Sequence, residues 1–139
     1  MDSRRIEEIR IGDSVELSKR LTEDDIRRFA DAVWGSIEAP PAQRCKDAKF
    51  SKAQSACEML CAGLISAVLS MHLPGPGART LSQILHFRQP LLAGDTFTAS
   101  VPVTDKHDLS NWVSLSTVCR NQKGDIVIDG EAVLLLPPC

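Results

Sequence analysis

The chain has 139 residues, of which 43% are hydrophobic and 24% charged, and its 16 basic and 18 acidic residues give a formal net charge of −2 at pH 7. These proportions are ordinary for a soluble globular protein, and the length predicts a single domain over residues 1–139. Because the basic residues are scattered, we expect no nucleic-acid partner. The N-terminus is charged and lacks a signal-peptide core, and the apolar run at 59–71 is interrupted and too short for a membrane span. We therefore expect no membrane partner and a cytoplasmic location.

Five cysteines stand at positions 45, 57, 61, 119 and 139. Their odd number and the lack of tandem pairs indicate reduced thiols rather than a disulfide framework. Cys57 and Cys61 are four residues apart, but two thiols without a nearby histidine or third cysteine make a poor zinc site, and buried cysteines usually pack as small apolar side chains. We therefore expect no metal and no cofactor.

The first predicted helix covers residues 22–33, and one more short strand is compatible with residues 14–18. Thr22 followed by Asp25 resembles a capping box, which marks the start of a helix. The apolar residues behind it recur at helical spacing, at Ile26, Phe29, Ala30 and Val33. Residues 34–55 lack a sustained period and include Gly35, Pro40 and Pro41. They predict a long, partly turned loop, and such a loop inside a compact domain is often functional.

The second predicted helix covers residues 56–71 and is the most apolar segment of the chain, with a single acid, Glu58, near its start. Its apolar residues cover more than one face, so we expect it to be buried almost all round. LPGPG at 73–77 ends it, because proline removes a backbone donor and glycine admits dihedrals that other residues avoid. The apolar residues are Met59, Leu60, Leu64, Ile65, Val68 and Leu69.

The rest of the chain favours strands. Residues 79–89, 95–104, 111–121 and 126–136 are rich in Val, Ile, Leu, Thr and Phe, and short polar connections separate them. In the third strand, positions 113, 115, 117 and 119 share one face by the two-residue period. The four strands predict an antiparallel meander curled around the buried helix, which is an α+β fold.

Three strings of this sequence resemble the MaoC-like branch of the hot-dog fold, which contains the (R)-specific enoyl-CoA hydratases. They are GDSVELSKRLTEDDIRRFADAV, GLISAVLSMHLPGPGARTLSQILHFRQPLLAGDTFTASVPVT and VCRNQKGDIVIDGEAVLLLPP, and they cover nearly the whole chain from Ile11 onward. The resemblance implies an antiparallel sheet wrapped around one long helix and a dimer whose sheets join edge to edge. It also implies an acyl thioester of coenzyme A or acyl carrier protein as ligand, and addition or removal of water across a 2,3 double bond.

The catalytic dyad of these relatives has no counterpart in this sequence. Relatives hold the reacting water with an aspartate and a histidine from a D-x-N-P-x-H loop motif after the first helix. Here that loop reads WGSIEAPPAQ, so the expected aspartate falls at Gly35 or Ser36 and the expected histidine at Pro40 or Pro41. No histidine occurs before His72. The resemblance therefore predicts the family's scaffold without its hydratase dyad.

The family's oxyanion-binding position also differs. Relatives use a backbone N–H from a His-Gly pair that opens the central helix, and here that pair is Cys57-Glu58. One interpretation is that Glu58 lies in the first turn and complements the helix dipole. Another is that Glu58 is the nucleophile or base of a thioesterase. Ser66, eight residues later, matches a serine that orients the catalytic aspartate in relatives.

The three histidines are expected away from this position. His72 ends the second helix, where a basic side chain suits the dipole. His86 points to the surface from a strand, opposite to Phe87, and His107 belongs to a turn.

Three functions follow from these observations. The first is an acyl-thioester-binding or structural subunit without the hydratase dyad, either a homodimer or a heterodimer with an active relative. The second is an enoyl-CoA hydratase or 3-hydroxyacyl dehydratase with a relocated base. The third is an acyl-CoA thioesterase in which Glu58 is the candidate catalytic residue. The candidate substrate-binding residues are Ser36, Pro40, Cys57, Glu58, Met59 and Ser66.

Overall fold

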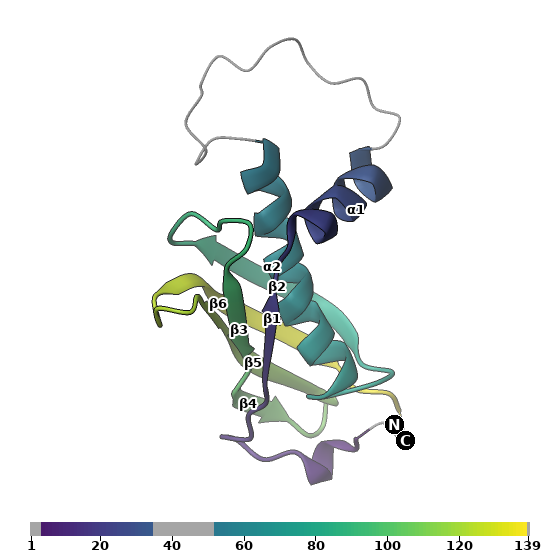
Figure 1. Ribbon diagram of the computed structural model, residues 1–139. Coiled ribbons are helices and arrows are strands. Elements are labelled where there is room, and N and C mark those ends of the chain that lie inside the picture. The colour runs from purple at the N-terminus through teal and green to yellow at the C-terminus, as the bar shows by residue number, and fades with distance from the viewer. Residues whose placement is uncertain (1–3, 35–51, 139) are drawn as a thin grey trace.

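The computed structural model describes residues 4–34 and 52–138, and Figure 1 shows how their elements are arranged. A long helix, α2, lies across one face of an antiparallel sheet, and a shorter helix, α1, lies beside its upper half. In chain order the elements are the 3-10 helix Ile6–Glu8, β1 (Glu16–Arg20), α1 (Glu23–Trp34), α2 (Lys52–Met71), β2 (Arg79–Phe87), β3 (Thr96–Ser100), β4 (Val103–His107), β5 (Trp112–Arg120) and β6 (Ile126–Leu135).

The sheet has the strand order β1-β3-β5-β6-β2, and β4 pairs with β5 beside β3. The predicted strand near 14–18 is confirmed as β1. The simple meander is wrong at one point, because β2 pairs with β6 and not with β3. The segment 88–95 carries the chain from the β2 edge to the far side of β5. Turn residues specify that a strand ends, but the choice of a non-adjacent partner depends on side-chain packing across the whole sheet.

The predicted strand 95–104 is wrong, because the structure divides it into β3 and β4. Pro102 stands at the break and has no backbone N–H to donate. Its carbonyl oxygen still accepts a 2.9 Å hydrogen bond from the Ser116 N–H, while the N–H groups of Val101 and Val103 donate to residues 15 and 13. Both β3 and β4 pair with β5, so the interruption divides the strand without detaching the chain from the sheet. β4 then continues to His107, which ends a strand and does not lie in the predicted turn.

α2 begins at Lys52, so the predicted loop 34–55 is wrong for residues 52–55. Gln54, which reads as a loop residue, is buried. The Gln54 amide is oriented so that its NH₂ group faces an acceptor. The side-chain oxygen then accepts a hydrogen bond from the Leu91 N–H at 2.7 Å, and the side-chain nitrogen donates one to the Leu91 backbone oxygen. The polar groups of this buried side chain thus find their hydrogen-bond partners on a backbone segment that is distant in the sequence.

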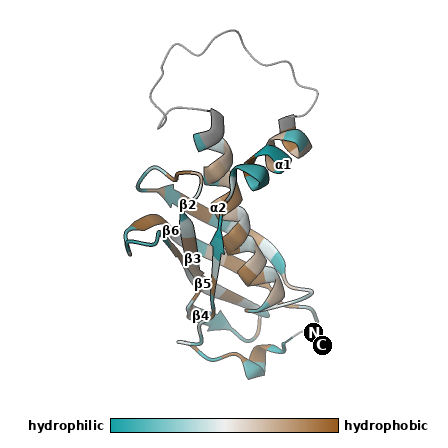
Figure 2. Cartoon of the chain, in the orientation of Figure 1, coloured by the Kyte–Doolittle hydropathy of each residue, from teal (hydrophilic) through white to brown (hydrophobic). Residues whose placement is uncertain are grey.

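The core forms between one face of α2 and the sheet. β5 presents positions 113, 115, 117 and 119 to it, which confirms the predicted alternation. The expectation that α2 is buried almost all round is wrong for the chain as described, because Ser55, Met59, Gly63 and Ser66 line an exposed stripe. Figure 2 shows mixed polar and apolar colouring on α1 and a largely apolar α2. The buried residues of α2 are Gln54, Ala56, Cys57, Cys61, Leu64, Ile65, Val68 and Leu69.

The length of α2 corrects one further expectation. Its window Gln54–Met71 spans 18 residues with a mean hydropathy of 1.4, so length and composition alone would allow a membrane span. The run at 59–71 therefore belongs to a longer apolar segment whose length would suffice for a span. In the structure 44% of this window is buried, and the buried side packs against the sheet as the core helix of a globular fold does.

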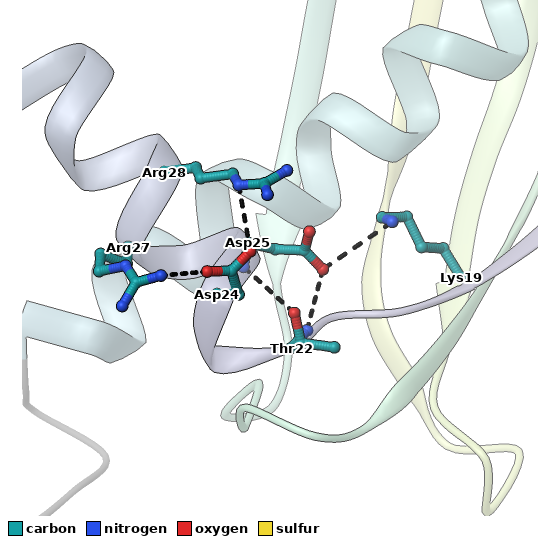
Figure 3. Close-up of polar contacts among 6 residues, drawn as sticks. All are labelled: Lys19, Thr22, Asp24, Asp25, Arg27 and Arg28. Atoms are coloured by element: carbon teal, nitrogen blue, oxygen red, sulfur yellow. Dashed lines mark hydrogen bonds and ion pairs between the residues drawn. The ribbon is translucent and has the colours of Figure 1, made fainter.

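α1 begins with the capping box that the sequence predicts (Figure 3). The Thr22 N–H donates to the Asp25 carboxylate at 3.0 Å, and the Asp25 N–H donates to the Thr22 hydroxyl at 3.1 Å. Lys19 lies 3.8 Å from the same carboxylate, and Asp24 pairs with Arg27 and Arg28 on the exposed side. The hydrogen bond from the Thr22 backbone, then the Thr22 hydroxyl, and more weakly Lys19 and Arg28, lower the pKa of Asp25.

The cap makes the stability of the protein depend on pH. Because the pKa of Asp25 is lower in the folded than in the unfolded chain, its contribution is present above the unfolded pKa of about 3.9 and is lost as the pH falls through the folded pKa. We expect Asp25→Asn to lower the urea midpoint at pH 7, and this difference from the parent protein to shrink as the pH falls below about 3.9 toward the folded pKa. Glu23→Gln removes the same charge from the same turn without touching the cap, and should show a smaller effect. Equal effects of the two substitutions would contradict the cap as the cause.

Gly130 in β6 is required by the closeness of β2. A Cβ at this position would overlap the backbone oxygen of Ile84, which cannot rotate away as a side chain does. We expect Gly130→Ala to lower the free energy of unfolding by at least about 2 kcal/mol, measured by urea denaturation. Gly63→Ala is the control, because Gly63 lies on the exposed stripe of α2 with open space around it. That change should stabilise the protein by about 0.5–1 kcal/mol. Unaltered stability in Gly130→Ala would show that the two strands can separate locally.

Candidate functional site

The candidate site lies around the second turn of α2, where Cys57, Glu58 and Met59 follow one another. Successive residues of an α-helix are rotated by about 100°, so these three side chains point in three directions. Cys57 faces the core and is 1% exposed, Glu58 is half-buried, and Met59 is 45% exposed. Ser66, two turns after Met59, lies on the same exposed stripe. The structure therefore divides the predicted binding residues between two faces of the helix.

Cys57 is held as a neutral thiol. Burial, and then the nearby carboxylates of Asp95 and Glu58, raise the pKa of the Cys57 thiol to about 11. All three causes disfavour the thiolate, which is the nucleophilic form of cysteine. Cys57 is therefore suited to packing rather than to nucleophilic attack.

Glu58 does not lie in the first turn of its helix, so the dipole interpretation is wrong. α2 starts at Lys52, which makes Glu58 its seventh residue. Only the N–H groups at the very start of an α-helix lack a partner within the helix, and Glu58 lies beyond them. The Glu58 N–H is therefore part of the hydrogen-bond ladder and does not point at a ligand.

Two residues that position this site were missed in the sequence. Gln54 fixes the start of α2 to the backbone of Leu91, and Asp95 is the carboxylate that acts on Cys57. The Asp95 carboxylate accepts a 2.9 Å hydrogen bond from the Gln122 side chain, and its backbone oxygen accepts from the Leu21 N–H at 3.1 Å. Asp95 belongs to the GDT string at the start of β3, which was a usable signal. Gln54 carried no sequence signal, because its burial depends on a distant segment.

None of the three histidines joins Glu58. His72 follows the end of α2, at the opposite end of the helix. His107 lies in β4, at the end of the molecule away from the start of α2 in Figure 1. Its Nε2 is 3.1 Å from the Asp105 carboxylate, and its ring stacks on Trp112. This exposed His–carboxylate pair is thus far from the candidate site.

His86 lies on the outer face of the sheet. It pairs across strands with Asp129, whereas the neighbouring pair, Phe87 with Ile128, belongs to the side that faces α2. Paired residues of antiparallel strands project to the same side, so the sheet separates His86 from α2. This confirms the surface position expected for His86. A hollow of about 310 Å³ surrounds it, lined by Ile84, His86, Asp129, Gly130 and Glu131.

Ser36 and Pro40, the remaining predicted binding residues, lie outside the described residues, as does the whole WGSIEAPPAQ loop beyond Trp34. Within residues 4–34 and 52–138, no group of three or more His, Cys, Asp or Glu side chains is placed to hold a metal ion. In this part of the chain, Glu58 is an acid in the second turn of α2 with no histidine beside it.

Comparisons with known proteins decide the family. No protein-family model matches the chain. It is, however, 40% identical over 131 residues to the (R)-specific enoyl-CoA hydratase of Rhodospirillum rubrum, a match that covers 94% of this chain and 90% of that protein. This chain belongs to the (R)-specific enoyl-CoA hydratase family. The solved structures agree with this assignment.

Two solved (R)-hydratases share the fold. The (R)-hydratase of Aeromonas caviae, involved in PHA biosynthesis, superposes with a TM-score of 0.76 at 32% identity, covering 93% of this chain and 98% of that one. R-hydratase PhaJ1 from Pseudomonas aeruginosa, in its unliganded form, gives a TM-score of 0.78 at 32% identity, covering 97% and 86%. The predicted α+β hot-dog fold is thereby confirmed. Within the (R)-specific enoyl-CoA hydratase family, this member has the hot-dog scaffold with Cys57-Glu58 in the second turn of its central helix.

The environment of Cys57 can be tested by alkylation. With a pKa about two units above that of an ordinary thiol, Cys57 has about 100-fold less thiolate at a given pH below 9, and its burial hinders the reagent as well. We expect iodoacetamide at pH 8 to modify Cys57 at least about 100-fold more slowly in the native than in the urea-unfolded protein, measured by peptide mass spectrometry. Similar rates in the two states would show that the thiol is accessible and its environment polar.

Proposed function

We propose that this (R)-specific enoyl-CoA hydratase family member binds acyl thioesters of coenzyme A or acyl carrier protein without hydrating them. It acts as a binding or structural subunit in the cytoplasm, as a homodimer or as a heterodimer with an active relative. The observation that carries the proposal is the sequence of the catalytic loop, in which small residues and prolines replace the aspartate and the histidine.

The chemistry explains why this replacement matters. Hydration of an enoyl thioester adds a proton at the α carbon and a hydroxyl at the β carbon, so water has to be activated and positioned together. Alanine, proline, serine and glycine have no group that titrates near neutral pH. A replacement base would have to come from elsewhere, and each described histidine lies at the far end of α2, in β4 or on the outer face of the sheet. This distribution supports a binding role.

The start of α2 favours a ligand with a polar head. The positive end of the helix dipole, at the start of α2, favours an oxygen or an anionic group. Met59 on the exposed stripe offers an apolar contact next to this end. A thioester carbonyl followed by an acyl chain has this combination of polar and apolar parts. The proposed ligand therefore matches the chemistry of the helix end.

The β2 edge supports the proposed pairing with a second subunit. β2 ends the sheet, so one side of its backbone has no partner among the described strands. Leu81 and Ile84 are each 47% exposed and Phe87 is 38% exposed along it. Long apolar edges are normally covered, because they otherwise promote aggregation. A second hot-dog subunit that continues the sheet would cover this edge.

A thioesterase is the second candidate, and one observation favours it. Glu58 is half-buried at the candidate site, and no hydrogen bond or ion pair to its carboxylate is found within the described ranges. An unpaired carboxylate in a partly desolvated position can attack a thioester carbonyl or activate water. The binding and thioesterase proposals differ in whether the thioester is cleaved.

Three assays on one purified sample test the proposed function. We expect no loss of the enoyl absorbance of crotonyl-CoA, with a rate at least about 1,000-fold below that of the Rhodospirillum rubrum hydratase measured in parallel, because general acid–base catalysis is missing. We expect no release of free thiol from saturated acyl-CoAs. Thermal unfolding should shift upward with acyl-CoA but not with free coenzyme A, because the acyl chain contributes to binding.

The alternatives have distinct signatures in the same assays. Hydration of crotonyl-CoA would overturn the proposal and require a relocated base. Thiol release that Glu58→Gln abolishes would establish the thioesterase instead. If acyl-CoA of every chain length tested leaves the unfolding temperature unchanged, the binding proposal fails. Light scattering of the same sample, alone and mixed with the active relative, distinguishes a homodimer from a heterodimer.

A further inference from the structure

A pair of thiols connects α2 to the middle of the sheet. Cys61 of α2 and Cys119 of β5 are both fully buried, and their Sγ atoms are 2.9 Å apart. Both are free thiols. The two residues are 58 positions apart in the sequence, so the contact joins two distant elements and not neighbours within one turn.

The two sulfur atoms lie close enough together for a disulfide bond to form between them after a small movement. A disulfide bond is about 2.05 Å long, and its side chains have to point at each other from backbones about 4.4–6.8 Å apart at the Cα atoms. Sulfur atoms already in hydrogen-bond contact need only a small further approach. Cys57, one helical turn before Cys61, is equally buried and free but has no such sulfur contact among the described residues.

We propose that Cys61 and Cys119 are a redox-sensitive pair, which a hydroperoxide converts into a disulfide that fixes α2 to β5. One thiol attacks the peroxide oxygen and becomes a sulfenic acid, releasing one water. The second thiol then attacks that sulfur, the S–S bond forms, and the sulfenic oxygen leaves as a second water. Two thiols thus lose two electrons and two protons to one hydrogen peroxide. A dithiol reductant reverses the change by thiol–disulfide exchange.

The crosslink acts on the most important packing contact of the fold. It closes a loop of 58 residues, which restricts the unfolded chain and so favours the folded state. It also limits any movement of α2 against the sheet, and α2 carries Cys57 and Glu58 one turn away from Cys61. The proposal concerns the scaffold itself, so it does not depend on the proposed thioester binding.

Burial determines when oxidation takes place. The hydrogen bond with Cys119, together with burial, raises the pKa of Cys61 well above that of an ordinary thiol. In the closed core little of the thiol is ionised, and the oxidant has little access to it. The reaction therefore proceeds when α2 opens locally or before α2 has packed. Oxidation should consequently accelerate in low urea that loosens the core without unfolding the protein.

Oxidation of the full-length protein with hydrogen peroxide, in the presence and absence of low urea, tests the proposal. We expect the intact mass to fall by about 2 Da and a peptide map under non-reducing conditions to join the peptides of Cys61 and Cys119. We also expect the unfolding temperature to rise by about 10 °C and to return after treatment with dithiothreitol. The map and the melt use the natural sequence, so they do not depend on a variant that folds.

Two matched cysteine variants test which thiols form the crosslink and cause the temperature shift. Cys57→Ala removes a buried thiol from the same helix face and should retain both the crosslink and the temperature shift. Cys61→Ala should lose both. A map that joins other cysteines, a mass increase from sulfinic acid in place of the 2 Da loss, or an oxidised protein with an unchanged or lower unfolding temperature would each overturn the proposal.

Discussion

The packing of one face of α2 against the antiparallel sheet is the contact on which the rest of the structure depends. Buried residues recur along α2 at three- and four-residue spacing, and the helix contacts β1, β2, β3 and β5 of the sheet. Burial of apolar area contributes about 25 cal/mol per Å², so this single interface contains much of the favourable free energy of folding. It also fixes which residues of α2 can face a ligand. Cys57 and Cys61 belong to the sheet side, and Met59 and Ser66 to the other.

The start of α2 shows how the same contact alters the chemistry of the site. Gln54 is drawn into the interface by the backbone of Leu91, and the helix therefore begins before the Cys57-Glu58 pair. An N–H group inside a helix already has its acceptor and cannot also stabilise a developing oxyanion. Under the proposed function, the Cys57-Glu58 sequence and the early start of the helix act in the same direction. Neither offers the backbone donor that hydration of a thioester would need at this place.

The sequence predicts the features that depend on neighbouring residues. The Thr22–Asp25 cap, the alternation along β5 and the extent of β6 follow from local hydrogen bonding and side-chain period. The position of β2 beside β6, the division at Pro102 and the helical state of residues 52–55 depend on distant contacts, and these were predicted wrongly. The same distinction holds for the candidate site. Glu58 could be singled out from its motif position, whereas its place in the second turn of α2 could not, because the contact between Gln54 and Leu91 has no local signal.

The separation of the histidines from Glu58 also bears on the proposal that this chain has no hydratase dyad of its own. A small shift of a loop moves a side chain by a few ångströms, but His86 is separated from α2 by the sheet, and His107 lies beyond the other end of the helix. The cores of proteins are packed at crystal-like density, so neither can cross the sheet without unfolding it. An imidazole would therefore have to come from a second subunit. Under the proposed pairing, a second subunit covers the exposed apolar edge of β2, so the pairing partner, rather than a rearrangement within this chain, determines whether a base is supplied.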